Sequence, residues 1–202
     1  NVVPDLAEVY YYVRHYDRLF VKQLFERVVK AAEGAAMCTE TILSYEVMHG
    51  NYSLMPNDTV QKLLHSQLIA FGGIEYTAAE QKYADQIYET LFEPSLKLGD
   101  EKKIMPYKQS HTYGSTDVGD VSWLIPTAGI RTATWVPGTS AHSWQAVAAG
   151  GMSIGLKGMK LAAKVLTASA KKIYENPEII VDAKQELASR VGEDFKYEAL
   201  LG

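Results

Sequence analysis

Histidines are the side chains in this sequence that are best suited to metal binding and proton transfer near neutral pH. There are five of them: His15, His49, His65, His111 and His142. No two have the His-x-x-x-His spacing that places two ligands on one face of a helix. A zinc site would therefore need ligands that the fold brings together from separate segments.

One histidine lies in a loop of small residues. His142 belongs to the segment 137–145 (Pro-Gly-Thr-Ser-Ala-His-Ser-Trp-Gln), between a predicted strand and a predicted helix. Loops carried by a rigid scaffold often hold binding and catalytic groups. A zinc ion needs three or four ligands, however, and nothing nearby in the sequence supplies the others. From the residues alone, His142 is either one zinc ligand or an ordinary hydrogen-bonded loop histidine.

Two aspartates lie three positions apart in the glycine-containing segment 114–120. Asp117 and Asp120 could orient a metal-bound histidine through hydrogen bonds. They could equally cap turns, which is the more common use of Asp beside Gly. In another predicted loop, His49 and Asn51 are further candidates for contact with a ligand.

Other reaction classes lack their sequence signatures. The chain has no Gly-x-Ser-x-Gly segment for a serine nucleophile and no glycine loop with phosphate-binding spacing. Cys38 is the only cysteine, so it excludes an internal disulfide and fits a reducing compartment. The net charge of −4 and the lack of a Lys/Arg run indicate no nucleic-acid partner. No apolar run approaches the roughly 18 residues that cross a bilayer, so we expect a cytoplasmic protein without membrane contact.

The elements that must position these groups are predicted from hydrophobic periodicity. The 202 residues, 47% of them hydrophobic, suffice for one core or for one domain and part of another. Aromatic and β-branched residues predict strands over 7–14 and 39–48. Apolar residues at four-residue spacing predict a helix over about 17–34, capped by Asp17. We therefore predict a strand-helix-strand unit in the first 54 residues.

The rest of the chain, 55–202, is predicted to combine helices with short strands. The helices are expected over about 58–71, 78–92, 152–174 and 177–191, and the strands over 121–125 and 132–136. The expected fold class is α/β: an α+β segment followed by part of a mixed-sheet domain.

Three segments taken together resemble one family. They are Asn1–Pro4 with the following strand-like run, Ser115–Trp123, and the loop 137–145. In this order they are similar to the lid-domain strand, an active-site loop and the last metal-ligand loop of the dizinc amidohydrolases, the family of aminoacylases, carboxypeptidases and deacetylases. Within that family the chain is most similar to the aminobenzoyl-glutamate hydrolases. The resemblance covers nearly the whole chain.

The resemblance implies a role for individual residues. His142 matches the C-terminal zinc ligand of the family, and Asn1 matches a lid asparagine that contacts substrate or the transition-state oxygen. Asp117 matches a position that lines the site, and Ser115 and Asp120 would support the ligands from behind. It also implies an incomplete zinc-peptidase architecture. In it, residues 1–54 would be the second half of a lid and dimerisation domain, and residues 55–202 the C-terminal part of the catalytic domain.

The family's other zinc ligands and its general-base glutamate have no counterpart here. We therefore expect the chain, which opens at Asn1 and not at a methionine, to be part of a longer enzyme and inactive alone. The resemblance implies a homodimeric parent that binds zinc or manganese and hydrolyses the amide of an N-acyl amino acid such as p-aminobenzoyl-glutamate. The alternative is a non-catalytic dimerisation or binding module whose histidines are all structural.

Overall fold

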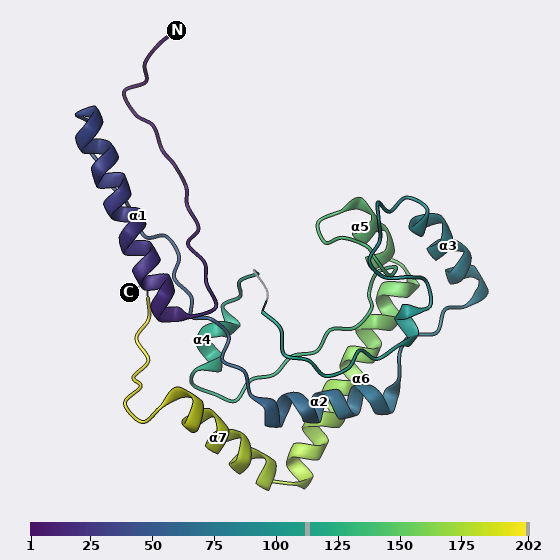
Figure 1. The fold of residues 1–202 in the computed structure, drawn as a ribbon. Helices are drawn as coiled ribbons and strands as arrows, with labels where there is room; N and C mark the ends of the chain where they lie inside the picture. The colour runs from purple at the N-terminus through teal and green to yellow at the C-terminus, as the bar shows by residue number, and fades with distance from the viewer. Residues whose placement is uncertain (112–113, 201–202) are drawn as a thin grey trace. The chain divides into compact units, whose positions relative to one another are not determined.

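The computed structural model describes residues 1–111 and 114–200, and the regular elements in these ranges are all helical (Figure 1). They are α1 (Arg18–Thr39), α2 (Asp58–Phe71), α3 (Ala78–Tyr88), the 3₁₀ helix η1 (Asp100–Lys102), α4 (Val118–Ser122), α5 (Trp144–Gly150), α6 (Ser153–Glu175) and α7 (Glu178–Val191). None of the helices in the described ranges is long and apolar enough to cross a membrane.

The chain divides into two compact units. Unit 1 comprises residues 1–55, 110–124 and the C-terminal segment from Asp194 onward. Unit 2 comprises residues 56–109 and 125–193. Unit 1 therefore combines three segments that are far apart in the sequence, and the assignment of residues 1–54 to a lid domain stays a prediction.

The predicted α/β fold with a mixed sheet is wrong, because the described residues contain no strand. The segments 7–14, 41–48 and 132–136 have no regular structure, and 121–125 forms the end of α4 and the turn after it. Strand propensity reflects how well a side chain fits a pleated, half-buried surface. Between residues 7 and 14 most side chains are exposed, Tyr11 by 69%, so no such surface covers them.

Helix α1 begins as predicted and ends later than predicted. The Asp17 side chain accepts hydrogen bonds from the backbone N–H groups of Leu19 (2.8 Å) and Phe20 (3.3 Å), which satisfies two donors at the helix start. Gly34, the predicted end, lies inside the helix. The chain leaves the helix at Glu40, whose φ of 55° is left-handed. No residue of α1 is buried, so α1 adds nothing to a closed core.

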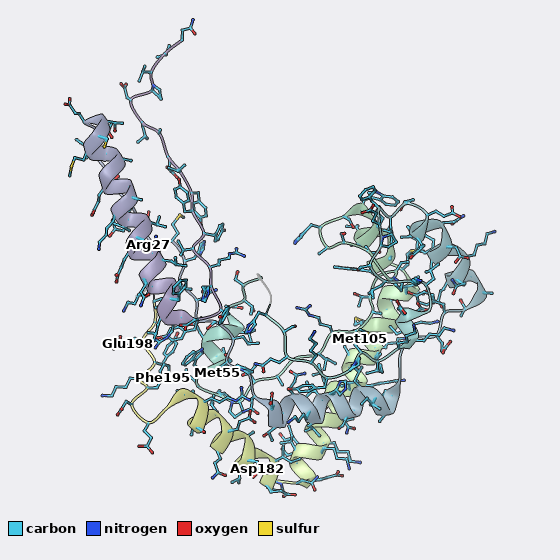
Figure 2. All side chains as sticks on the ribbon, in the orientation of Figure 1. Arg27, Met55, Met105, Asp182, Phe195 and Glu198 are labelled. Carbon is cyan, nitrogen blue, oxygen red and sulfur yellow. The ribbon has the colours of Figure 1, made fainter. Side chains whose placement is uncertain are left out.

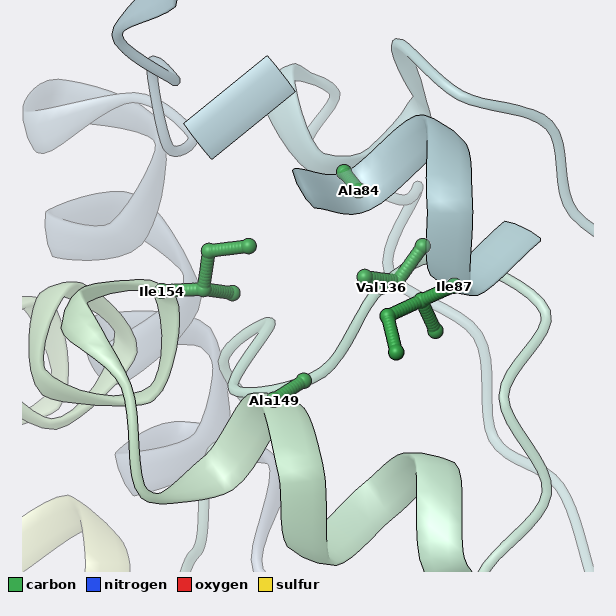
Figure 3. Packing of buried hydrophobic residues seen from close by; sticks show 5 residues of the cluster. All are labelled: Ala84, Ile87, Val136, Ala149 and Ile154. Atoms are coloured by element: carbon green, nitrogen blue, oxygen red, sulfur yellow. The ribbon is translucent and has the colours of Figure 1, made fainter. Parts of the chain in front are cut away.

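Unit 2 contains the main hydrophobic core. Its centre is formed by Ala84, Ile87, Val136, Ala149 and Ile154, which come from α3, α5, α6 and the loop before α5 (Figure 3). Helix α6 contacts both α2 and α5, and α2 also contacts α7. The four long helices of this unit were predicted from the sequence, although α3 ends at Tyr88 and not near residue 92.

Two carboxylates, one buried and one partly buried, join helices of unit 2. Glu186 on α7 accepts hydrogen bonds from the backbone N–H groups of Asp58 (2.7 Å) and Thr59 (2.9 Å) at the start of α2. Burial raises the pKa of Glu186, but a hydrogen bond from the Thr59 hydroxyl (2.7 Å), the two backbone bonds and Arg190 outweigh burial and hold the pKa at about 2. Glu80 on α3 forms an ion pair with Lys157 on α6. These contacts tie α2 to α7 and α3 to α6.

Candidate functional site

His142 lies in the turn before α5, in unit 2. Its φ of 59° is in the left-handed region, which histidine enters more readily than most residues. The turn is held by Ser143, whose hydroxyl donates to the Ser140 carbonyl (2.7 Å) and accepts from the Ala146 N–H (3.2 Å). The same turn therefore fixes His142 and starts α5.

His142 borders an open hollow on the surface of unit 2. The hollow is lined by Trp135, His142, Ser143, Trp144, Ala146 and Val147. The imidazole is exposed and makes no hydrogen bond or ion pair with any residue of the described ranges. An imidazole with free nitrogens beside two tryptophans could take a ligand.

The described residues do not fit a complete metal site. Within residues 1–111 and 114–200, no group of three or more His, Cys, Asp or Glu side chains comes close enough to hold an ion. Zinc is held by three or four ligands in proteins. Among the described residues, His142 can therefore supply at most one ligand of a metal site.

The two aspartates of the predicted active-site loop lie in unit 1 and have different surroundings. Asp117 is exposed at the N-terminal end of α4, and its side chain makes no capping hydrogen bond. Ser115 is exposed in the loop before it. The Asp120 carboxylate accepts hydrogen bonds from the Tyr52 N–H (3.2 Å) and the Tyr197 hydroxyl (3.0 Å). Asp120 thus connects segments of unit 1, whereas Asp117 and Ser115 are open to solvent.

The remaining predicted site residues also lie in unit 1 and are exposed. Asn1 begins an extended segment, and His49 and Asn51 lie just before Tyr52. Through the Tyr52–Asp120 hydrogen bond, the structure brings the segment of His49 and Asn51 next to α4. It thus brings together two of the predicted loops, and the roles of these side chains toward a substrate stay predictions.

The sequence analysis missed a group that organises this region, which we call the Tyr52 cluster: Arg18, Tyr52, Trp123, Phe195 and Tyr197. Tyr52 is at its centre and is only 3% exposed. Its ring packs against Trp123, Phe195 and Tyr197 at centroid distances of 5.4, 6.3 and 5.2 Å. The Arg18 guanidinium lies 4.8 Å from the Tyr52 ring centroid and donates to the Tyr52 hydroxyl (3.0 Å). In the sequence, two aromatic residues separated by one lysine, Phe195 and Tyr197, follow the last helix. This pattern was the available signal that the segment packs against other aromatic residues.

Gly119 is a second residue that the sequence analysis missed. A Cβ atom built at this position would lie 2.0 Å from the Tyr52 carbonyl oxygen, which is far inside van der Waals contact. Glycine is therefore required for α4 to approach the segment 50–55. The Met55 N–H donates to the Ser122 hydroxyl (2.8 Å), and the Trp123 indole donates to the Ser53 carbonyl (2.7 Å), along the same contact.

Comparison with known proteins reveals one related hydrolase. No family model and no solved structure matches the chain. A subunit of the p-aminobenzoyl-glutamate hydrolase of Escherichia coli strain K12 is 33% identical over 211 residues, which cover 92% of this chain and 44% of that subunit.

This chain is a relative of a p-aminobenzoyl-glutamate hydrolase subunit. The resemblance drawn from three short segments is therefore confirmed over nearly the full length of the chain. The chain spans less than half the length of the hydrolase subunit that it matches.

Proposed function

We propose that this chain is part of an amide hydrolase, and that the parent enzyme cleaves the amide bond of an N-acyl amino acid such as p-aminobenzoyl-glutamate. The observation that carries the proposal is the 33% identity to the p-aminobenzoyl-glutamate hydrolase subunit over 92% of the chain. A similarity that extends over both compact units supports shared descent of the whole segment more than reuse of one short motif.

In this proposal His142 supplies one ligand for zinc or manganese, and polypeptide outside the described residues supplies the others and the general base. Support comes from the free, exposed imidazole beside the hollow of Trp135 and Trp144. In the assembled parent, the substrate is contacted by four further residues: Asn1, His49, Asn51 and Asp117. Ser115 and Asp120 support the groups that contact metal and substrate. Because a single ligand does not hold zinc at a catalytic site, the chain alone is inactive.

The proposed parent is a cytoplasmic homodimer that pairs through the lid domain, residues 1–54. The relative is named as a subunit, which favours an oligomeric parent. Helix α1, with no buried residue, is available for contact with another chain.

The test uses the full-length parent carrying His142→Ala. We expect its rate of p-aminobenzoate release from p-aminobenzoyl-glutamate to fall by at least about 100-fold. Loss of a residue that only hydrogen-bonds a metal ligand already lowers activity by about 10–100-fold, and loss of the ligand itself should lower it more. Metal content, measured by mass spectrometry, should fall as well. The matched control is His65→Ala, which changes a histidine on α2 whose ring lies beside Tyr107 and should leave both values near those of the parent.

Two results would contradict the proposal. If the His142→Ala parent kept its metal and its rate, the chain would instead fit a binding or dimerisation module with structural histidines. If the isolated 202-residue chain hydrolysed the amide as fast as the parent, the dependence on further polypeptide would be wrong.

A further inference from the structure

The C-terminal segment after α7 belongs to unit 1, although α7 itself belongs to unit 2. Helix α7 ends at Val191, and residues 194–200 contain no regular structure in which their own backbone groups would pair. Figure 2 labels Phe195 and Glu198 on this segment. Because it has no secondary structure, its position depends on contacts with other parts of unit 1.

Two hydrogen bonds attach this segment to the rest of unit 1. The Tyr197 hydroxyl donates to the Asp120 carboxylate on α4 (3.0 Å). The Tyr52 hydroxyl donates to the Glu198 carbonyl (2.8 Å). The first bond has a charged acceptor, which makes it the stronger kind. Both bonds lie at the junction between α4 and the segment 50–55.

Ring contacts reinforce the same attachment. Phe195 packs against Trp123, with 4.9 Å between centroids, and the Arg18 guanidinium lies 5.5 Å from the Phe195 ring centroid and 5.2 Å from that of Trp123. Aromatic pairs and cation–π contacts at these separations are attractive. The segment thus contacts the start of α1, the segment 50–55 and the end of α4 at one place.

Helix α4 needs such external support. It has only five residues, and Asp117 at its start makes no side-chain capping bond. Helices shorter than about 12 residues are marginal in water without packing, so α4 has little stability of its own. Contacts with the rest of unit 1, among them those of Asp120 and Trp123, therefore order α4, and the C-terminal segment provides part of them.

We propose that residues 194–200 act as a strap that holds α4 and the loop before it in place, so that release of the strap loosens residues 114–123 while unit 2 stays folded. The strap is a conformational device that couples residues 194–200 to the loop of Ser115 and Asp117. It does not depend on the hydrolase proposal, since it concerns contacts within unit 1.

The test is hydrogen–deuterium exchange of the 202-residue chain, read by mass spectrometry. Tyr197→Phe removes the bond to Asp120 and keeps the ring, and Phe195→Ala removes the contact with Trp123. Each should raise the exchange rate of residues 114–123 several-fold and leave α6 unchanged. The matched control is Tyr174→Phe, because Tyr174 lies on α6 and is 88% exposed. Unchanged exchange of residues 114–123 in both variants would overturn the proposal.

A second experiment separates attachment from an effect of the substitutions. A chain that ends at Glu193 should lose protection at residues 114–123, and a synthetic peptide of residues 194–202 added in excess should restore it. Retained protection in the shortened chain would overturn the proposal, as would failure of the peptide to restore it. Loss of protection in α6 as well would also count against it, because the strap is proposed to act on unit 1 alone.

Discussion

At the residue scale, Glu80 shows how a buried charge is accommodated in unit 2. Glu80 accepts the Thr77 N–H (2.7 Å) in a capping box and pairs with Lys157. The hydrogen bond from Lys157 is the main reason that the pKa of Glu80 is lowered to about 2. The Lys157 ammonium also donates to the Glu75 carbonyl (2.7 Å), so one cation fastens α6 to the start of α3.

Glu80→Gln should therefore destabilise the chain at pH 7 by about 1–2 kcal/mol, because the hydrogen bond to Lys157 loses its charged acceptor while Lys157 remains. Urea unfolding followed by circular dichroism measures the change. The matched control is Glu75→Gln, which removes an ion pair with Lys102 from a side chain that is 75% exposed and should change stability by less than about 0.5 kcal/mol. Equal losses in the two variants would contradict this account of Glu80.

Individual residues also mark the limit of prediction at the candidate site. The loop position of His142 was predicted, because Pro137, Gly138 and small residues around it indicate a turn. The connecting role of Asp120 was not, because it depends on Tyr52 and Tyr197, which are 68 and 77 positions away. Sequence spacing cannot reveal such pairs, since the fold alone brings them together.

At the scale of elements, helices were predicted better than strands for a physical reason. Asp17, Asn57 and Thr77 each cap the helix that the sequence places after them, and these bonds are local. A strand needs a neighbouring strand and a surface to pack on, neither of which is local. The runs at 7–14 and 132–136 have suitable residues but lack those partners in the described ranges.

The close contact between α4 and the segment 50–55 gives a prediction at this scale. Gly119→Ala places a methyl group against the Tyr52 carbonyl and should separate the two segments, at a cost of about 1–3 kcal/mol. Hydrogen exchange of residues 50–55 and 118–123 should rise, and Trp123 should become more accessible to a fluorescence quencher. The control is Gly114→Ala, because a Cβ there meets nothing within 4 Å. Exchange rates of Gly119→Ala equal to those of the control would contradict the contact.

At the scale of the whole molecule, much apolar surface stays uncovered. On α6, Leu156, Met159 and Leu166 are each at least 50% exposed and follow at intervals of three and seven residues, which places them on one face of the helix. Exposed apolar side chains that gather on one face often mark an interaction site. The match covers 44% of the hydrolase subunit. The exposed face of α6 agrees with the proposal that further polypeptide of the parent packs against this chain.

Two carboxylates in unit 2 make the stability of the folded chain sensitive to acid. The pKa values of Glu80 and Glu186 are both about 2 in the folded chain, below the value of about 4.3 for an unfolded glutamate. A lowered folded pKa means that the contribution to stability is complete above the unfolded pKa and is lost as the pH falls from about 4.3 towards 2. The melting temperature, measured by calorimetry, should therefore drop steeply across this interval.

The double variant Glu80→Gln/Glu186→Gln tests this assignment. Its drop in melting temperature should be smaller, and the curves of melting temperature against pH for the variant and the unsubstituted chain should approach each other near pH 2. A double variant that loses as much melting temperature as the parent between pH 4.5 and pH 2 would assign the acid sensitivity to other groups.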